Sequence, residues 1–176
     1  MFLCHAVTMD LQWSLTQAAQ HGMICSMRVV ADTHLHLYPV FDTVQALRGL
    51  ATNLRRLDPD AVRVGFVVDR HDCEGFSAVR DLLPSAGLSA TATGSDLCVR
   101  VDMEDGAPLY VVAGCQVATR ERIEILGLGC APGIVDGTPA GEAVAAVLDA
   151  GGVPVVARAL GKWMFGRARV VRDLFD

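Results

Sequence analysis

The sequence has almost no lysine, no paired-cysteine motif and no long apolar run, and each absence excludes a class of protein. Only Lys162 among the 15 basic residues is a lysine, and 20 acidic residues bring the net charge to −5. Without a broad basic surface the chain cannot hold a polyanion by counterion release, which excludes general nucleic-acid binding. No stretch approaches the ~20 apolar residues of a membrane span, and the N-terminus lacks the regions of a signal peptide. We therefore expect a cytoplasmic protein without a membrane partner.

Cysteine usage points to the same compartment. The six cysteines are scattered and form no C-x-x-C pair; they are Cys4, Cys25, Cys73, Cys98, Cys115 and Cys130. In apolar surroundings such residues behave as small hydrophobic side chains, which favours a reducing cytoplasm. The 52% hydrophobic content is enough for one well-packed domain.

The first 26 residues fit the rest of the chain poorly. Met27 opens a strongly strand-like run, and Met23 or Met27 is an alternative start. We interpret residues 1–26 as an N-terminal extension and residues 27–176 as a single α/β domain. The alternative, that the extension belongs to the fold, stays open at this point.

From residue 28 onward, β-rich runs alternate with helical patterns, which is typical of parallel βα units. The pattern predicts strands over 28–36, 62–69 and 153–157, a hairpin of 88–102 with 109–117, and helices over 41–57, 75–83, 119–128, 139–150 and 163–175. The hairpin is predicted from the Asp105-Gly106 turn. Because helices would cover a parallel sheet, the predicted fold class is α/β, with an inserted β-hairpin.

The most informative motif is the Asp-x-His-x-His sequence at the end of the first predicted strand. Alternation along a strand predicts that Asp32, His34 and His36 project from one face. Two imidazoles about 7 Å apart can converge on one divalent ion, and the carboxylate can bind the ion or orient a ring. The sequence thus predicts a metal site of Asp32, His34 and His36, for zinc, manganese or iron.

This motif after an apolar first strand resembles the opening motif of the polymerase and histidinol phosphatase (PHP) domain family, with amidohydrolase-like barrel enzymes as a wider likeness. The resemblance implies a distorted (β/α)7 barrel, two or three metal ions and phosphoester hydrolysis by a metal-activated water. The family's first motif carries over onto His34 and His36. A full barrel of this type needs about 250 residues, whereas 150 follow residue 26. We therefore expect a partial or truncated (β/α) barrel of PHP/TIM-like type. Either it pairs as a homo-oligomer that covers its open edges, or the chain is a truncated gene product.

A second stretch, Asp69-Arg-His71, resembles the family's Asp-His motif, with Arg70 inserted. The resemblance makes Asp69 and His71 candidate catalytic residues, as a second ion site or a general base. Gln116 stands where the family has a glutamate, and Arg158 stands where it has a histidine. Arg158 and Lys162 are candidate substrate-binding residues, because cationic side chains can hold a phosphate.

Two functions remain open from the sequence. One is a metal-dependent hydrolase, a phosphoesterase acting on a small phosphorylated molecule. The other is a catalytically degenerate PHP-like scaffold that acts as a binding or assembly domain, which the loss of ligands at Gln116 and Arg158 favours.

Overall fold

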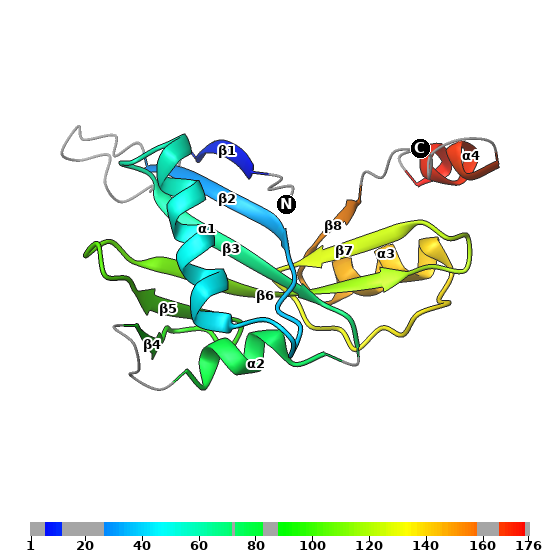
Figure 1. The fold of residues 1–176 in the computed structure, drawn as a ribbon. Coiled ribbons are helices and arrows are strands. Elements are labelled where there is room, and N and C mark those ends of the chain that lie inside the picture. The colour runs from blue at the N-terminus through cyan, green and yellow to red at the C-terminus, as the bar shows by residue number, and fades with distance from the viewer. Residues whose placement is uncertain (1–5, 12–26, 72, 83–87, 158–165, 175–176) are drawn as a thin grey trace.

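The computed structural model describes residues 6–11, 27–71, 73–82, 88–157 and 166–174 (Figure 1). Its centre is a mixed sheet of eight strands, in which β2 (Met27–Leu35), β3 (Val62–Asp69) and β6 (Leu109–Ala118) are parallel neighbours. Two adjacent valines near the end of β3, Val67 and Val68, are fully buried. Burial on both faces is typical of a central parallel strand, so β3 anchors the core on which the remaining strands assemble.

Strand β6 joins the two halves of the sheet. Its first half pairs antiparallel with β5 (Cys98–Asp102), and its second half pairs antiparallel with β7 (Glu124–Leu128). Three further strands extend the sheet: β4 (Ser89–Ala92) beside β5, β8 (Val153–Val156) beside β7, and β1 (Ala6–Leu11) beside β2. Part of the N-terminal segment thus lies in the sheet as an antiparallel strand.

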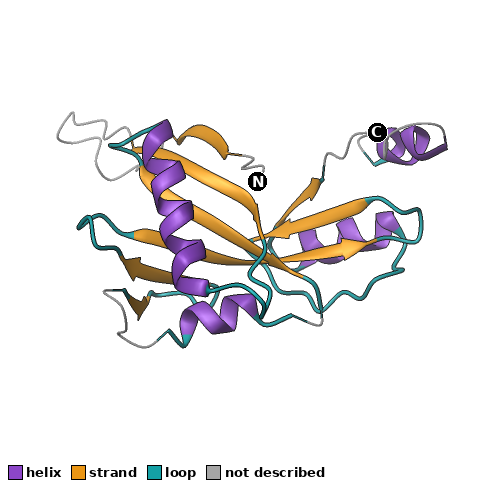
Figure 2. Ribbon diagram, viewed as in Figure 1, coloured by secondary structure: helices purple, strands orange, loops and turns teal. Residues whose placement is uncertain are grey.

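Within the described residues, four helices accompany the sheet: α1 (Thr43–Leu57), α2 (Gly75–Arg80), α3 (Ala140–Asp149) and α4 (Gly166–Asp173). Helix α1 begins at Asp42, whose Oδ1 accepts a hydrogen bond from the Gln45 backbone N–H at 3.1 Å. Its buried Leu47 and Leu54 belong to one core with Val30 and Val67. Figure 2 shows α1 crossing β2 and β3, while α3 packs on the part of the sheet formed by β7 and β8.

The expected barrel is wrong, because the sheet is open and mixed. Barrel closure requires successive parallel strands joined by crossover helices. Here a turn connects β6 to its antiparallel neighbour β7. Helix α3 then connects β7 to β8, and these two strands are also antiparallel. The parallel pairing of β2 with β3 and the antiparallel pairing of β5 with β6 agree with the sequence-based expectation. The third expected parallel strand, over 153–157, is instead the antiparallel β8, and β6, expected as part of an inserted hairpin, is the parallel neighbour of β3.

The predicted helix over residues 119–128 is also wrong. The segment contains a tight turn, with Arg122 at φ 61°, followed by β7. The Thr119 hydroxyl donates to the Ile123 carbonyl at 3.0 Å and closes the turn. Ile123, Ile125 and Leu126 are buried in the sheet, and this cluster of apolar residues carries no clear helical or strand period. Tertiary pairing with β6 therefore decides its structure.

An ion pair ties the start of β3 to the turn between β5 and β6. Arg63 is only 4% exposed, and its two terminal nitrogens bond both carboxylate oxygens of Asp105 at 2.8 and 3.0 Å. Arg63 also donates to the Ala107 carbonyl. This bidentate contact holds the β5–β6 turn against the first residues of β3.

None of the helices in the described ranges has the length and apolar character needed to cross a bilayer.

Candidate functional site

The candidate residues gather at the carboxyl ends of the three parallel strands. His34 and His36 lie at and just beyond the end of β2, Asp69 ends β3, and Gln116 lies in the last part of β6. In open α/β sheets, ligands bind outside the carboxyl ends of the strands. The location therefore suits a binding site even though no barrel mouth is formed.

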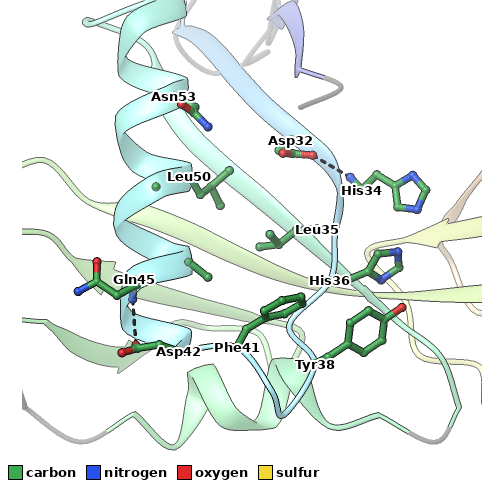
Figure 3. A pocket seen from close by; sticks show the side chains of 12 residues that line it. Asp32, His34, Leu35, His36, Tyr38, Phe41, Asp42, Gln45, Leu50 and Asn53 are labelled. Carbon is green, nitrogen blue, oxygen red and sulfur yellow. Dashed lines mark hydrogen bonds between the residues drawn. The ribbon is translucent and has the colours of Figure 1, made fainter. Parts of the chain in front are cut away.

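A register shift in β2 separates Asp32 from the two histidines. Asp32 pairs with Gly65, and Leu35 pairs with Val67. Between these two pairs β2 advances by three residues while β3 advances by two, so β2 contains one extra residue. Asp32 and Leu35 are thereby on the α1 side, and His34 and His36, flanking Leu35, point away from α1 (Figure 3). The expectation that the three side chains share one face is wrong, because an irregularity of this kind reverses the alternation.

Asp32 forms a hydrogen bond within its own strand. Its carboxylate is buried and accepts the backbone N–H of His34 at 3.0 Å through Oδ1. This local hydrogen bond competes with regular ladder pairing, and it lies within the shifted stretch of β2. Asp32 thereby holds the backbone conformation that turns His34 to the opposite face.

The two imidazoles form a pair beside Gln116. Their ring centroids are 4.9 Å apart with the planes at 71°. The Nε2 atom of His34 lies 3.1 Å from Oε1 of Gln116. His34, from the Asp-x-His-x-His motif, and Gln116 are therefore adjacent in space although they are far apart in the sequence.

His36 has a second aromatic neighbour and an unusual environment. Its ring stacks on Tyr38 with centroids 5.2 Å apart and planes at 14°. Burial and the proximity of His34 lower the pKa of His36, although a hydrogen bond with the Val68 backbone and the charges on Glu124 and Asp32 oppose this shift. The Nδ1 atom is buried and has no hydrogen-bond partner among the described residues. A neutral imidazole is the form that binds metals.

The Asp69 side chain caps the start of α2. Its Oδ2 accepts the Phe76 backbone N–H at 2.9 Å, whereas Glu74, the residue at the helix N-cap, makes no side-chain cap bond. A Cβ built on Gly75 would lie 2.8 Å from both Asp69 Oδ1 and the Leu37 carbonyl oxygen, so only glycine fits there. Burial raises the pKa of Asp69 against the opposing backbone N–H groups. The carboxylate proposed as catalytic thus has a defined structural role.

Of the other predicted site residues, the structure describes only His71. His71 lies exposed in the turn after β3. Arg70 forms an ion pair with Asp136 at 2.6 Å. Arg158 and Lys162, the predicted substrate-binding residues, lie outside the described residues.

The structure adds residues that the sequence motifs do not reveal. Glu124, at the start of β7, exerts an electrostatic influence on His36. The incorrect helix prediction for residues 119–128 hid its position next to β6. Tyr38 follows His36 by two residues and could have been found from the aromatic character of the segment that continues to Phe41.

The donor set fits a divalent ion only in part. Two ligands about 2.1 Å from a tetrahedral zinc ion lie about 3.4 Å apart, whereas His34 Nε2 and Gln116 Oε1 are 3.1 Å apart as a hydrogen-bonded pair. The Nδ1 atom of His36 adds a buried nitrogen that has no hydrogen-bond partner in the described part of the chain. Within the described ranges, no group of three or more His, Cys, Asp or Glu side chains is arranged to hold a metal. Any site here would consist of two imidazoles and a neutral amide oxygen.

Comparison of the chain with protein-family models, with curated proteins and with solved structures found no match.

Proposed function

We propose that the protein is a metal-dependent hydrolase whose ion is held by His34, His36 and Gln116. The observation that carries this proposal is the 3.1 Å approach of Gln116 to His34. The two residues correspond to separate motifs of the PHP resemblance, and no local sequence constraint brings them together. Three protein ligands with one open position are typical of catalytic zinc.

A bound divalent ion would supply an activated water, because it lowers the pKa of water from 15.7 to about 7. The protein's own contribution is to present the neutral imidazole of His36. Burial and His34 keep the pKa of His36 low, so its ring is available as a ligand at neutral pH. Glu124 adds negative charge near His36, which favours a cation at this position.

We propose a small phosphorylated molecule as the substrate, on the basis of the PHP resemblance alone. We also propose a homo-oligomer. Strand β8 pairs only with β7 among the described strands, and its Val153 is 61% exposed. A second copy could cover this edge. Sedimentation analysis showing a monomer at all concentrations would reject the oligomer without affecting the metal site.

The decisive experiment is elemental analysis of protein purified without an affinity tag or chelator. We compare the native chain with the His34→Ala, His36→Ala double variant and with His71→Ala, an exposed histidine outside the pair. About one equivalent of transition metal in the native chain and in His71→Ala, but none in the double variant, supports the site. Hydrolysis of aryl phosphoesters should then follow metal content. Circular dichroism confirms that all three proteins are folded.

A second candidate is the binding or assembly scaffold. It is favoured by the absence of a carboxylate from the histidine pair's donor set, because Asp32 lies on the α1 side and Asp69 serves α2. Absence of metal from all three proteins, after incubation with zinc and with manganese, would support this candidate and overturn the hydrolase.

A further inference from the structure

A cavity of about 420 Å³ lies between α1 and the end of β2 (Figure 3). Pockets for small molecules have volumes of about 300–1,000 Å³, so one compact ring system would fit. The cavity borders the histidine pair, since His34 and His36 contribute to its lining. Most of its wall comes instead from α1 and from the loop that leads into this helix.

The cavity wall favours a flat apolar group. Leu35 and Leu50 belong to it, together with Phe41 and Tyr38. The Tyr38 and Phe41 rings are 6.0 Å apart and tilted by 43°, and Tyr38 is stacked on His36. A planar ring can pack against the aliphatic wall and meet these aromatic rings in tilted or offset geometry.

The charge of the lining selects against anions. Asp32 and Asp42 contribute carboxylates to the wall, and Gln45 and Asn53 contribute amides. Neither lysine nor arginine occurs among the lining residues. A cationic group with N–H donors is complementary to two carboxylates, whereas a phosphate or carboxylate would be repelled.

Gly49 leaves space on the helix side of the cavity. Ala46, Gly49, Leu50 and Asn53 all line the cavity and follow the i, i+3, i+4, i+7 spacing of one helix stripe. A Cβ built on Gly49 meets no atom within 4 Å. Glycine within a helix is unfavourable relative to alanine, and local packing does not require it here. A ligand in the cavity would give this glycine a function.

We propose that this cavity binds an aromatic ring bearing a cationic N–H group, such as a benzylic amine or an aryl amidine. The inference rests on the proposed function in one respect: the ring would be the part of the substrate that does not react, held beside the histidine pair. Binding energy from such a remote group positions the reacting centre.

The test is calorimetric titration of the chelator-treated, full-length chain with benzamidine, with benzoate and with neutral benzyl alcohol. We expect benzamidine to bind at least about tenfold more tightly than benzoate. Gly49→Leu should weaken benzamidine binding by about fivefold or more, because the new side chain grows from the stripe that lines the cavity. Gly141→Leu is the matched control: it is a helical glycine in α3 whose Cβ position is also open, and it should leave binding unchanged.

Equal binding of benzamidine and benzoate, or equal effects of Gly49→Leu and Gly141→Leu, would overturn the proposal. Should Gly49→Leu fail to fold, Asp42→Asn provides a second test. Asparagine retains the cap acceptor for the Gln45 N–H but removes the charge, and it should reduce the preference for benzamidine over benzyl alcohol. Because the titrations contain no metal, ring binding can succeed where metal binding fails, and the two proposals fail separately.

Discussion

The Nε2 atom of His34 lies 3.1 Å from Oε1 of Gln116, although 82 residues separate them in the chain. The contact joins the end of β2 to the last part of β6 across β3, which lies between these two strands. It places a neutral amide oxygen beside the His34 imidazole. The charge at position 116 is therefore the most direct determinant of how strongly this site can hold a cation.

Gln116→Glu should increase affinity for zinc or manganese. The substitution keeps the side-chain length and replaces a neutral oxygen by an anionic one, so we expect at least about tenfold tighter binding. Calorimetric titration of metal into the chelator-treated protein measures the change. Gln116→Ala, which removes the donor, should bind more weakly than the native chain. A glutamate variant no tighter than the native protein would show that position 116 does not contact the ion.

Asp69→Asn and Asp69→Ala separate a structural role from a catalytic one. Asparagine retains an acceptor for the Phe76 N–H, whereas alanine does not. We expect Asp69→Ala to be less stable than Asp69→Asn by about 1 kcal/mol, the usual value of a helix cap. Urea unfolding at pH 7 measures the difference. Equal stability of the two variants would indicate that the bond to α2 contributes little.

The same carboxylate predicts a pH dependence. Burial raises the pKa of Asp69 above its ordinary value of 3.8, so the native state binds its proton more tightly than the unfolded state does. Its contribution to stability is present below pH 3.8 and is lost as the pH rises through the folded-state pKa. Comparison of native and Asp69→Asn unfolding across this range should show a steeper fall in the native protein. Parallel curves would contradict the assignment.

Asp105→Ala should destabilise the fold by about 3 kcal/mol, because it leaves the buried guanidinium of Arg63 without its carboxylate. Asp81→Ala is the control: the Arg80–Asp81 pair has a 3.4 Å contact and side chains 52% and 71% exposed. Removing this pair should change the free energy of unfolding by less than about 0.5 kcal/mol. Similar losses in both variants would argue against the Arg63–Asp105 pair as the anchor of the β5–β6 turn.

Cys130 should resist alkylation in the folded protein. Burial, followed by the influence of the neighbouring Cys115, raises the pKa of its thiol from 9.0 to about 11. A shift of this size lowers the thiolate fraction by roughly a hundredfold at neutral pH, and the thiolate is the reactive form. Peptide mapping after timed iodoacetamide treatment, with and without urea, measures the protection. Fast modification of Cys130 without urea would contradict its buried placement.

Local patterns were sufficient for much of the secondary structure. The three- to four-residue spacing of apolar side chains predicted α1, and the valine-rich run predicted β3. The Asp105-Gly106 turn predicted the pairing of β5 with β6. These elements could be predicted because their signals lie within a few residues. The segment from 119 to 128 could not, since its apolar cluster suits either a helix or a strand until β6 is beside it.

The candidate site, too, was predicted only in part from local sequence patterns. The sequence by itself determined that two histidines and an aspartate lie at the end of an apolar strand, and that position 116 carries a neutral amide. Only the tertiary structure decided that a register shift turns Asp32 away from the histidines and that Gln116 meets His34. Strand alternation depends on the pairing register, and contact between distant residues depends on strand order. Both are set by packing between elements rather than by any local stretch of sequence.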